Sequence, residues 1–185
     1  MTRRELLERA AVVVAAAVSL GHTPYRQWQV YRQSRLIIVT GAEDEQAFAV
    51  AEALAALLAR HLPDSRATVA RARDTVEAVN LVASRQLDVL LIAAREARGA
   101  AAGQGRFANT GPVPLRTLAL VGDWALVCRD DFPVERAYRV ARALSERRAE
   151  LPRPASATPA TTPAAAPVPL HPGALDYHQA SPPRP

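Results

Sequence analysis

Side chains that commonly carry out catalysis are few in this 185-residue chain and lie far apart in the sequence. Its four histidines are His22, His61, His171 and His178. None of them has a neighbouring acid or histidine at the spacing of metal ligands. His171 precedes Asp176 and Ser181, but a triad is defined by geometry, and no nucleophile elbow, Walker loop or dinucleotide fingerprint is present. We therefore expect no catalytic residue, no metal site and no cofactor, with a hydrolase kept as an alternative.

The other reactive groups are also restricted in type. Every one of the 23 basic residues is arginine, which excludes Schiff-base and P-loop lysine chemistry. Cys128 is the single cysteine, so it has no partner for an internal disulfide or a cysteine metal site. It follows the apolar residues 124–127, and this context predicts a buried structural thiol.

Positive charge is concentrated at the start of the chain. The net charge is +5 and the pI is about 10.3, but residues 1–35 alone hold six arginines and two glutamates. The other 150 residues are nearly balanced, with 17 arginines and 16 acids. A nucleic-acid-binding surface needs basic residues on the folded domain, so we expect no nucleic-acid partner.

Residues 1–34 have the pattern of a signal or membrane anchor with a juxtamembrane segment. Residues 2–8 hold two arginines and two glutamates and precede an apolar run at 10–20, as in export signals. The paired Arg3-Arg4 resemble the twin-arginine motif. Tyr25 and Trp28 then suit a membrane interface. We expect an exported protein, periplasmic or anchored in the inner membrane, whose N-terminus contacts the membrane. A cytosolic N-terminal helix packed on the domain is the alternative.

Residues 35–151 predict an α/β domain. Apolar runs typical of buried strands occupy 36–39, 67–70 and 88–93, and helical periodicity fills 48–58 and the segment opened by Asp74 and Glu77. This strand–helix alternation favours a mostly parallel sheet with flanking helices. The runs 118–121 and 124–127 predict a hairpin or one bent strand.

Three further segments complete the expected organisation. The Ala-, Gly- and Arg-rich residues 94–114 are expected to form a loop. A last helix is expected from Pro133, with Val134, Ala137 and Tyr138 at helical spacing. Residues 152–168 are rich in Pro, Ala and Thr and predict a flexible linker.

The C-terminal segment 169–185 holds the most ordered-looking motif, at 169–177. Its Pro172-Gly173 pair predicts a fixed turn, and the flanking Leu170, Leu175 and Tyr177 supply apolar anchors. His171 is expected to be a turn residue that hydrogen-bonds to the backbone. The alternative is a chance cluster in a disordered tail.

This closing segment resembles the C-terminus of the TAXI-type solute receptors of TRAP transporters. The resemblance rests on Leu170-His171-Pro172-Gly173-Ala174 followed by Tyr177, and on two earlier segments in the family's order, 75–89 and 125–138. It implies the two-lobed type II periplasmic-binding-protein fold, with a ligand held between the lobes. Because the body is about half the family's length, with the deficit between residues 95 and 125, we expect one lobe only.

The resemblance also implies a site at the first turn, where the family has a glycine-rich loop. Such a loop offers backbone N–H groups to an anionic solute near a helix N-terminus. Here the turn carries the acids Glu43, Asp44 and Glu45, which suit the helix dipole but would repel a carboxylate ligand. The ligand-binding candidates at strand ends and a helix start are Thr40, Gly41 and Thr75.

The expected function is that of a non-catalytic, TAXI-like receptor subunit of a TRAP transporter system. It would bind a small organic anion weakly or have lost binding, with the transporter's membrane subunits as partners. One alternative is an exported or membrane-tethered α/β accessory protein without solute binding. A cytosolic α/β interaction domain is another.

Overall fold

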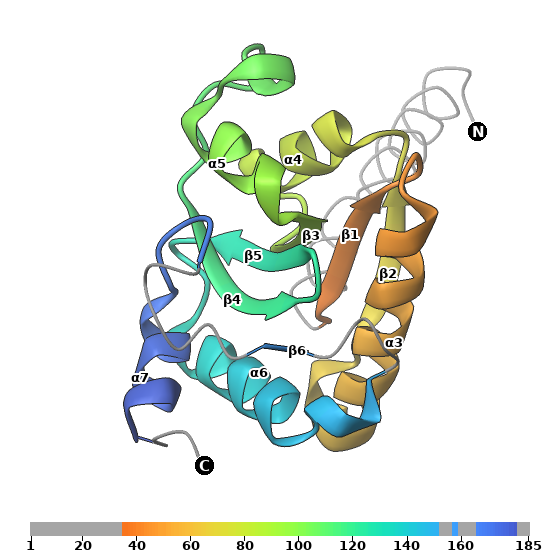
Figure 1. The fold of residues 1–185 in the computed structure, drawn as a ribbon, viewed down its shortest axis with the longest axis vertical. Helices are drawn as coiled ribbons and strands as arrows, with labels where there is room; N and C mark the ends of the chain where they lie inside the picture. The colour runs from red at the N-terminus through yellow and green to blue at the C-terminus, as the bar shows by residue number, and fades with distance from the viewer. Residues whose placement is uncertain (1–34, 152–156, 159–165, 181–185) are drawn as a thin grey trace, which may run out of the picture. The chain divides into compact units, whose positions relative to one another are not determined.

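The computed structural model describes residues 35–151, 157–158 and 166–180 as a mixed α/β fold (Figure 1). The segment 1–34, predicted to be a signal or anchor, lies outside the described residues, as does most of the linker predicted at 152–168. A six-stranded sheet has the order β2-β1-β3-β5-β4-β6. Its strands are β1 (Ile37–Gly41), β2 (Thr68–Ala72), β3 (Val89–Ala93), β4 (Leu115–Val121), β5 (Trp124–Arg129) and β6 (Ala157–Thr158).

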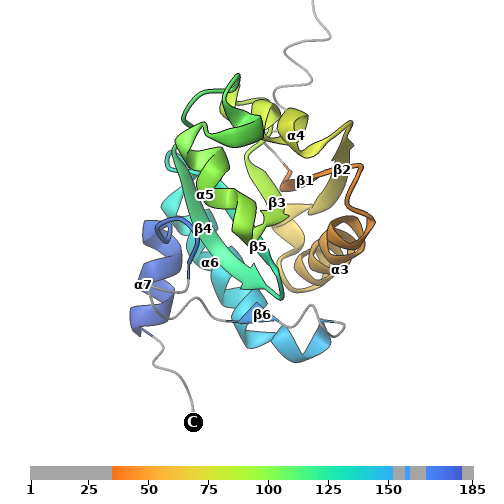
Figure 2. The same cartoon turned by 45° about the horizontal axis from the view of Figure 1, so that its top comes forward.

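Five helices accompany the sheet in the described residues. They are α3 (Glu45–His61), α4 (Thr75–Ala83), α5 (Ala94–Ala102), α6 (Val134–Glu146) and α7 (Pro172–Ala180). The helices α4 and α5 share one hydrophobic cluster with one face of the sheet, whereas α3 and α6 share another cluster with the opposite face. In Figure 1, α4 and α5 lie above the strands, whereas α6 lies below them and α3 lies at their right; Figure 2 shows the same elements turned by 45°. The expected helix layers on both faces are therefore confirmed.

The sheet has a parallel part and an antiparallel part. Strands β2, β1 and β3 are parallel neighbours, as the strand–helix alternation predicts. Strands β4 and β5 form an antiparallel hairpin, which settles the open choice at 118–127, and β5 also pairs antiparallel with β3. The hairpin turn at Gly122, where φ is +57°, brings the chain back beside the parallel strands.

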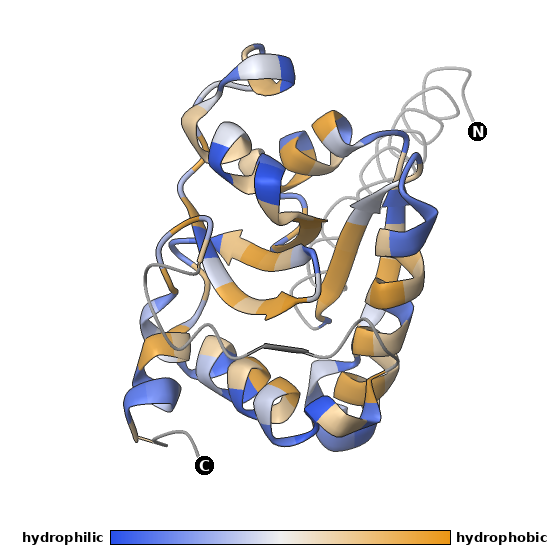
Figure 3. Cartoon of the chain, viewed as in Figure 1, coloured by the Kyte–Doolittle hydropathy of each residue, from blue (hydrophilic) through white to orange (hydrophobic). Residues whose placement is uncertain are grey.

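Alternation along the strands divides the core between the two faces. In β1, Ile38 belongs to the cluster on the α3 side and Val39 to the cluster on the α4 side, because successive side chains of a strand point to opposite faces. Figure 3 shows the strands β1, β4 and β5 as mostly hydrophobic ribbons between helices with mixed faces. Cys128 is fully buried, as predicted from its apolar context.

The prediction of a loop at 94–114 is wrong for its first nine residues, which form the helix α5. Alanine, arginine and glutamate are good helix formers, and their propensity outweighs the single Gly99 inside the helix. Gly103 ends α5 in the left-handed conformation, with φ of +62°, as glycine commonly does at a helix C-terminus. A 3-10 turn at Gly105–Phe107 then leads towards β4.

The turn predicted at Pro172-Gly173 is instead the first turn of α7. Proline suits the first helical position because its missing N–H has no partner there in any helix. The Nδ1 of His171 accepts the Gly173 N–H at 3.2 Å, so this histidine does hydrogen-bond to the backbone, as expected. It acts as the cap of a helix rather than as part of an isolated turn.

The residues before α7 are attached to the edge of β4. The Thr117 N–H donates to Pro169 O at 2.9 Å, and the His171 N–H donates to Thr117 O at 2.9 Å. The Thr117 hydroxyl adds a bond of 2.8 Å to Val168 O, and the Val168 side chain is buried. The end of the predicted linker, residues 166–168, is thus packed on the domain.

Helix α7 packs closely against α6. Gly173 lies so near the α6 backbone that an added Cβ would meet the carbonyl oxygen of Val134 and the nitrogen of Tyr138. Farther along, Ala174 and Tyr177 are buried against Ala141, and the rings of Tyr138 and Tyr177 meet edge to face at 5.7 Å. The C-terminal motif is therefore a docked helix that completes the domain.

Candidate functional site

Two of the three predicted ligand-binding residues lie against each other. Gly41 ends β1 and Thr75 begins α4, and a Cβ on Gly41 would fall 2.5 Å from the Thr75 nitrogen. Thr40 is fully buried, but the strand alternation points it to the α3 face of the sheet. The structure therefore brings Gly41 and Thr75 together and separates Thr40 from them.

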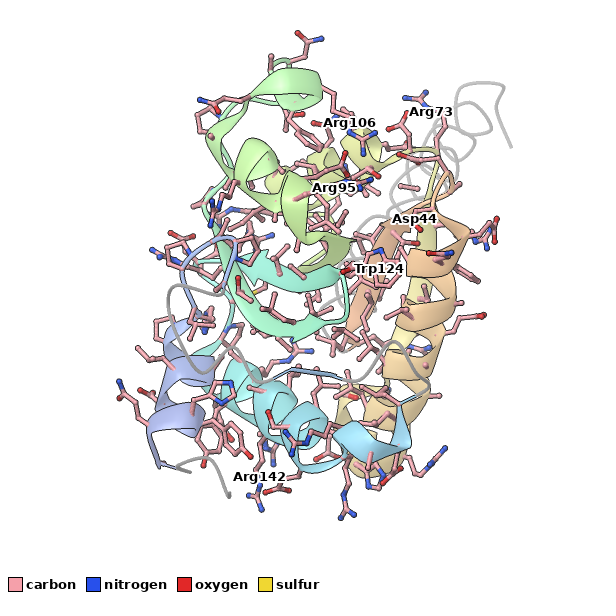
Figure 4. All side chains as sticks on the ribbon, viewed as in Figure 1. Asp44, Arg73, Arg95, Arg106, Trp124 and Arg142 are labelled. Atoms are coloured by element: carbon pink, nitrogen blue, oxygen red, sulfur yellow. The ribbon has the colours of Figure 1, made fainter. Side chains whose placement is uncertain are left out.

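An open cavity of about 1030 Å³ lies beside this pair, at the carboxyl ends of β1 and β3. Ligands of open α/β sheets commonly bind at this edge, where the loops leave the strands. The cavity is lined by Glu43, Asp44, Gln46, Thr75, Ala93, Ala94, Arg95, Glu96, Arg98, Arg106, Leu120, Gly122, Asp123, Trp124 and Pro167. Figure 4 labels four of these side chains, with Arg95 and Arg106 on the α5 side and Asp44 and Trp124 towards α3.

The carboxylate of Glu43 occupies the space between Gly41 and Thr75. Its Oε1 accepts the backbone N–H of Thr75 at 2.8 Å, and the Thr75 hydroxyl is a second hydrogen-bond partner. Arg106 places a guanidinium nitrogen 3.5 Å from the same oxygen. A helix N-terminus, a hydroxyl and a guanidinium are the groups that proteins use to bind anions, and here they hold a carboxylate from the chain itself.

The ionisation of Glu43 follows from these contacts. Partial burial favours the neutral acid and raises the pKa, but the hydrogen bonds from Thr75 and the charge of Arg106 outweigh it. The net effect is a pKa of Glu43 below its usual range. The group is therefore a carboxylate at neutral pH, and the anion position is filled by a full negative charge.

The arginines on the α5 side differ in their pairing. Arg106 bridges two acids, because its second guanidinium nitrogen lies 2.9 Å from Glu96. Arg98 donates to the carbonyl oxygen of Pro167 at 3.1 Å. Among the described residues neither Arg95 nor Arg98 has an ion-pair partner, and Arg95 also lacks the carbonyl contact that Arg98 makes, so its guanidinium is available to a ligand in the cavity.

The opposite wall is fixed by a buried aromatic side chain. Trp124 begins β5 and is only 8% exposed, and its indole N–H donates to Asp44 Oδ2 at 3.1 Å. The other oxygen of Asp44 accepts the Ala47 N–H at 2.8 Å and caps α3. This pair ties the start of α3 to the β4–β5 turn at one side of the cavity.

Among the described residues, no histidine or cysteine lines this cavity. His171 is fully buried at the α7 cap, far along the chain, and burial lowers its pKa. Burial raises the pKa of the Cys128 thiol, which keeps it protonated. Within the described ranges, no three His, Cys, Asp or Glu side chains group as metal ligands.

Sequence reasoning missed three residues of the site: Glu43 as the bound carboxylate, Arg106 and Trp124. Glu43 could have been found from its position, because it is an acid that follows the strand end at Gly41 by two residues. Arg106 stands in the segment expected to be a loop, and its ion pairs depend on the position of that segment in space. Trp124 faces Asp44 across 80 residues of sequence, a pairing without a local signal.

Comparison with known proteins assigns the chain to no family. No protein-family model matches the chain, and none of the curated proteins matches it either. Over the part of the chain that the structure describes, no helix has the length and apolar character required to cross a bilayer.

Proposed function

We propose that the protein is a non-catalytic, solute-receptor-like domain of the TAXI type that serves a TRAP transporter system and binds a small organic anion weakly. In this proposal the protein is exported, is either periplasmic or anchored in the inner membrane, and has the transporter's membrane subunits as partners. The type II periplasmic-binding-protein fold, reduced to one lobe, is part of the same proposal. The structure itself supports only the general α/β class, of which the type II periplasmic-binding-protein fold is one member.

One observation supports this function above the others. Thr75, singled out as a ligand-binding residue, lines a cavity of about 1030 Å³ and already holds a carboxylate, and Gly41 beside it leaves space for that carboxylate. The cavity has the size of an ordinary small-molecule site. Its wall offers Arg95 to a ligand anion.

Weak binding follows from the same geometry. Glu43 already satisfies the Thr75 N–H, and four acids line the cavity: Glu43, Asp44, Glu96 and Asp123. An incoming carboxylate has to compete with the first of them and approach the others. This observation also favours the second candidate function, an exported or tethered accessory protein without solute binding.

A binding experiment separates the two functions. Thermal unfolding of the full chain is followed with each amino acid and dicarboxylic acid at millimolar concentration, against sodium chloride at equal ionic strength. A saturable rise in Tm that is lost in Arg95→Ala supports the solute receptor. No rise with any acid, together with co-purification of the transporter's membrane subunits, supports the accessory protein. If no acid raises the Tm and no membrane subunit co-purifies, the proposal is overturned.

A further inference from the structure

We propose that Glu43 is an autoinhibitory residue, whose carboxylate competes with external carboxylates for one anion position between β1, α4 and the turn at Gly105–Phe107. This inference rests on the proposed solute site and specifies why that site binds weakly. It assigns the position to the carboxylate class of ligand, because a carboxylate is the group that the surrounding donors hold.

The donors come from elements far apart in the sequence and meet on one carboxylate. Thr75 supplies its N–H at 2.8 Å and its hydroxyl from the start of α4. Arg106 approaches to 3.5 Å from a turn that lies 63 residues away from Glu43. Gly41 leaves the space, since a Cβ there would lie 2.5 Å from Glu43 Oε2. The fold therefore builds an anion position that does not depend on a single helix end.

Glu43 is attached to this position in a way that permits exchange. It belongs to the short turn between β1 and α3, and its side chain is 40% exposed. The side chain borders the cavity, so a rotation of Glu43 away from Thr75 would leave the donors facing open space. Glu96 already shares Arg106 at 2.9 Å, which keeps the guanidinium in place when Glu43 leaves.

An attached carboxylate has a concentration advantage over a free one. Groups joined by a short flexible link meet at effective concentrations in the millimolar range or above. A free carboxylate of similar intrinsic affinity therefore competes poorly with Glu43 at lower concentrations. Removal of the Glu43 side chain abolishes this competition and leaves the Thr75 donors without their carboxylate, beside an Arg106 that keeps its pair with Glu96.

Chemical rescue of Glu43→Ala by acetate tests the inference. Alanine keeps the Cβ of Glu43, and acetate has the atoms of the deleted CH₂–COO⁻ group. We expect the Tm of the full-length variant to fall below that of the parent and to rise saturably with acetate, beyond the effect of equal sodium chloride. Half-saturation is expected on the order of 10 mM, as suits a ligand of four heavy atoms.

Three proteins serve as controls under the same conditions. The parent and Glu43→Gln retain a side chain in the position, so neither is expected to respond to acetate beyond salt. Glu45→Ala removes a neighbouring acid whose partner, Arg71 at 2.7 Å, does not line the cavity, and it is also expected not to respond. An equal acetate response in Glu45→Ala or in the parent overturns the inference, as does no response in Glu43→Ala.

The outcome stays readable if Glu43→Ala folds poorly. Refolding yield is then measured in acetate and in sodium chloride, where a higher yield in acetate supports the inference and equal yields refute it. The experiment also distinguishes a failure of this inference from a failure of the proposed function. Acetate rescue without binding of any amino or dicarboxylic acid supports the anion position and removes the solute-receptor function. Solute binding that is unchanged in Glu43→Ala supports the receptor and removes autoinhibition.

Discussion

Gly173→Ala is expected to separate α7 from α6 and to lower the stability of the whole domain. The added Cβ would lie 2.9 Å from the Tyr138 nitrogen and closer still to the Val134 carbonyl oxygen, whereas ordinary contacts begin at 3.4 Å. The helices therefore have to move apart by at least about 0.5 Å at Tyr138 and farther at Val134. Both atoms belong to the backbone and cannot rotate away. We expect a loss of about 2–3 kcal/mol, the upper part of the range for overpacking.

Gly99→Ala is the matched control, because it makes the same change inside another helix. A Cβ at Gly99 has its nearest neighbours at 3.6 and 3.8 Å, which are ordinary contacts. We expect a gain of about 0.5–1 kcal/mol from the higher helix propensity of alanine. Urea unfolding followed by circular dichroism measures both variants against the parent. A Gly173→Ala protein within about 0.5 kcal/mol of the parent, beside a stabilised Gly99→Ala protein, would refute the described α6–α7 contact.

Three further outcomes follow from individual side chains. Burial lowers the pKa of His171 below 6.5, so as the pH falls through 6.5 the unfolded chain gains a proton first and stability declines. His171→Asn should remove this part of the decline in urea midpoints between pH 8 and 5, and an unchanged pH dependence would contradict the buried imidazole. Trp124→Phe removes the donor to Asp44 and should cost about 0.5–1.5 kcal/mol in thermal unfolding; equal stability would argue against this bond. Cys128 should not react with a thiol reagent at pH 8 until urea unfolds the protein, and prompt labelling of the folded chain would show that the thiol is accessible.

The parallel half of the domain was predictable from the sequence because its signals are local. The buried strand at 89–93 is a continuous apolar run, and Asp74 caps α4 through the Glu77 N–H at 2.7 Å, as its position before the helix indicated. The end of α3 before Pro63 follows from the chemistry of proline. Each of these features depends on residues within about one helical turn of one another.

The prediction failed where two local tendencies compete or where distant segments meet. Residues 94–102 mix strong helix formers with glycine, and tertiary burial of Ala97 and Ala100 decides in favour of the helix. At Pro172-Gly173, the same dipeptide suits a turn or a helix start, and docking on α6 selects the helix.

The candidate site was predictable in part for the same reason. The strand end at Gly41 and the helix start at Thr75 are local features, and both are in the site. Thr40 lies at the same strand end, but side chains alternate between the two faces of a sheet, so Thr40 points to the other face. The role of Glu43 depends on a hydrogen bond across 32 residues, which composition and spacing do not specify.

The attachment of residues 168–171 to Thr117 has a consequence for synthesis of the chain. A ribosome makes β4 and α6 long before the segment that covers them, so a nascent chain exposes an open strand edge and the surface of α6 where Gly173 later docks. Unpaired strand edges on incomplete domains are the places where chains associate wrongly. We therefore expect stop codons placed before residue 168 to produce aggregating protein rather than a smaller soluble domain. Supply of a peptide spanning 166–180 to such a truncated chain should restore solubility.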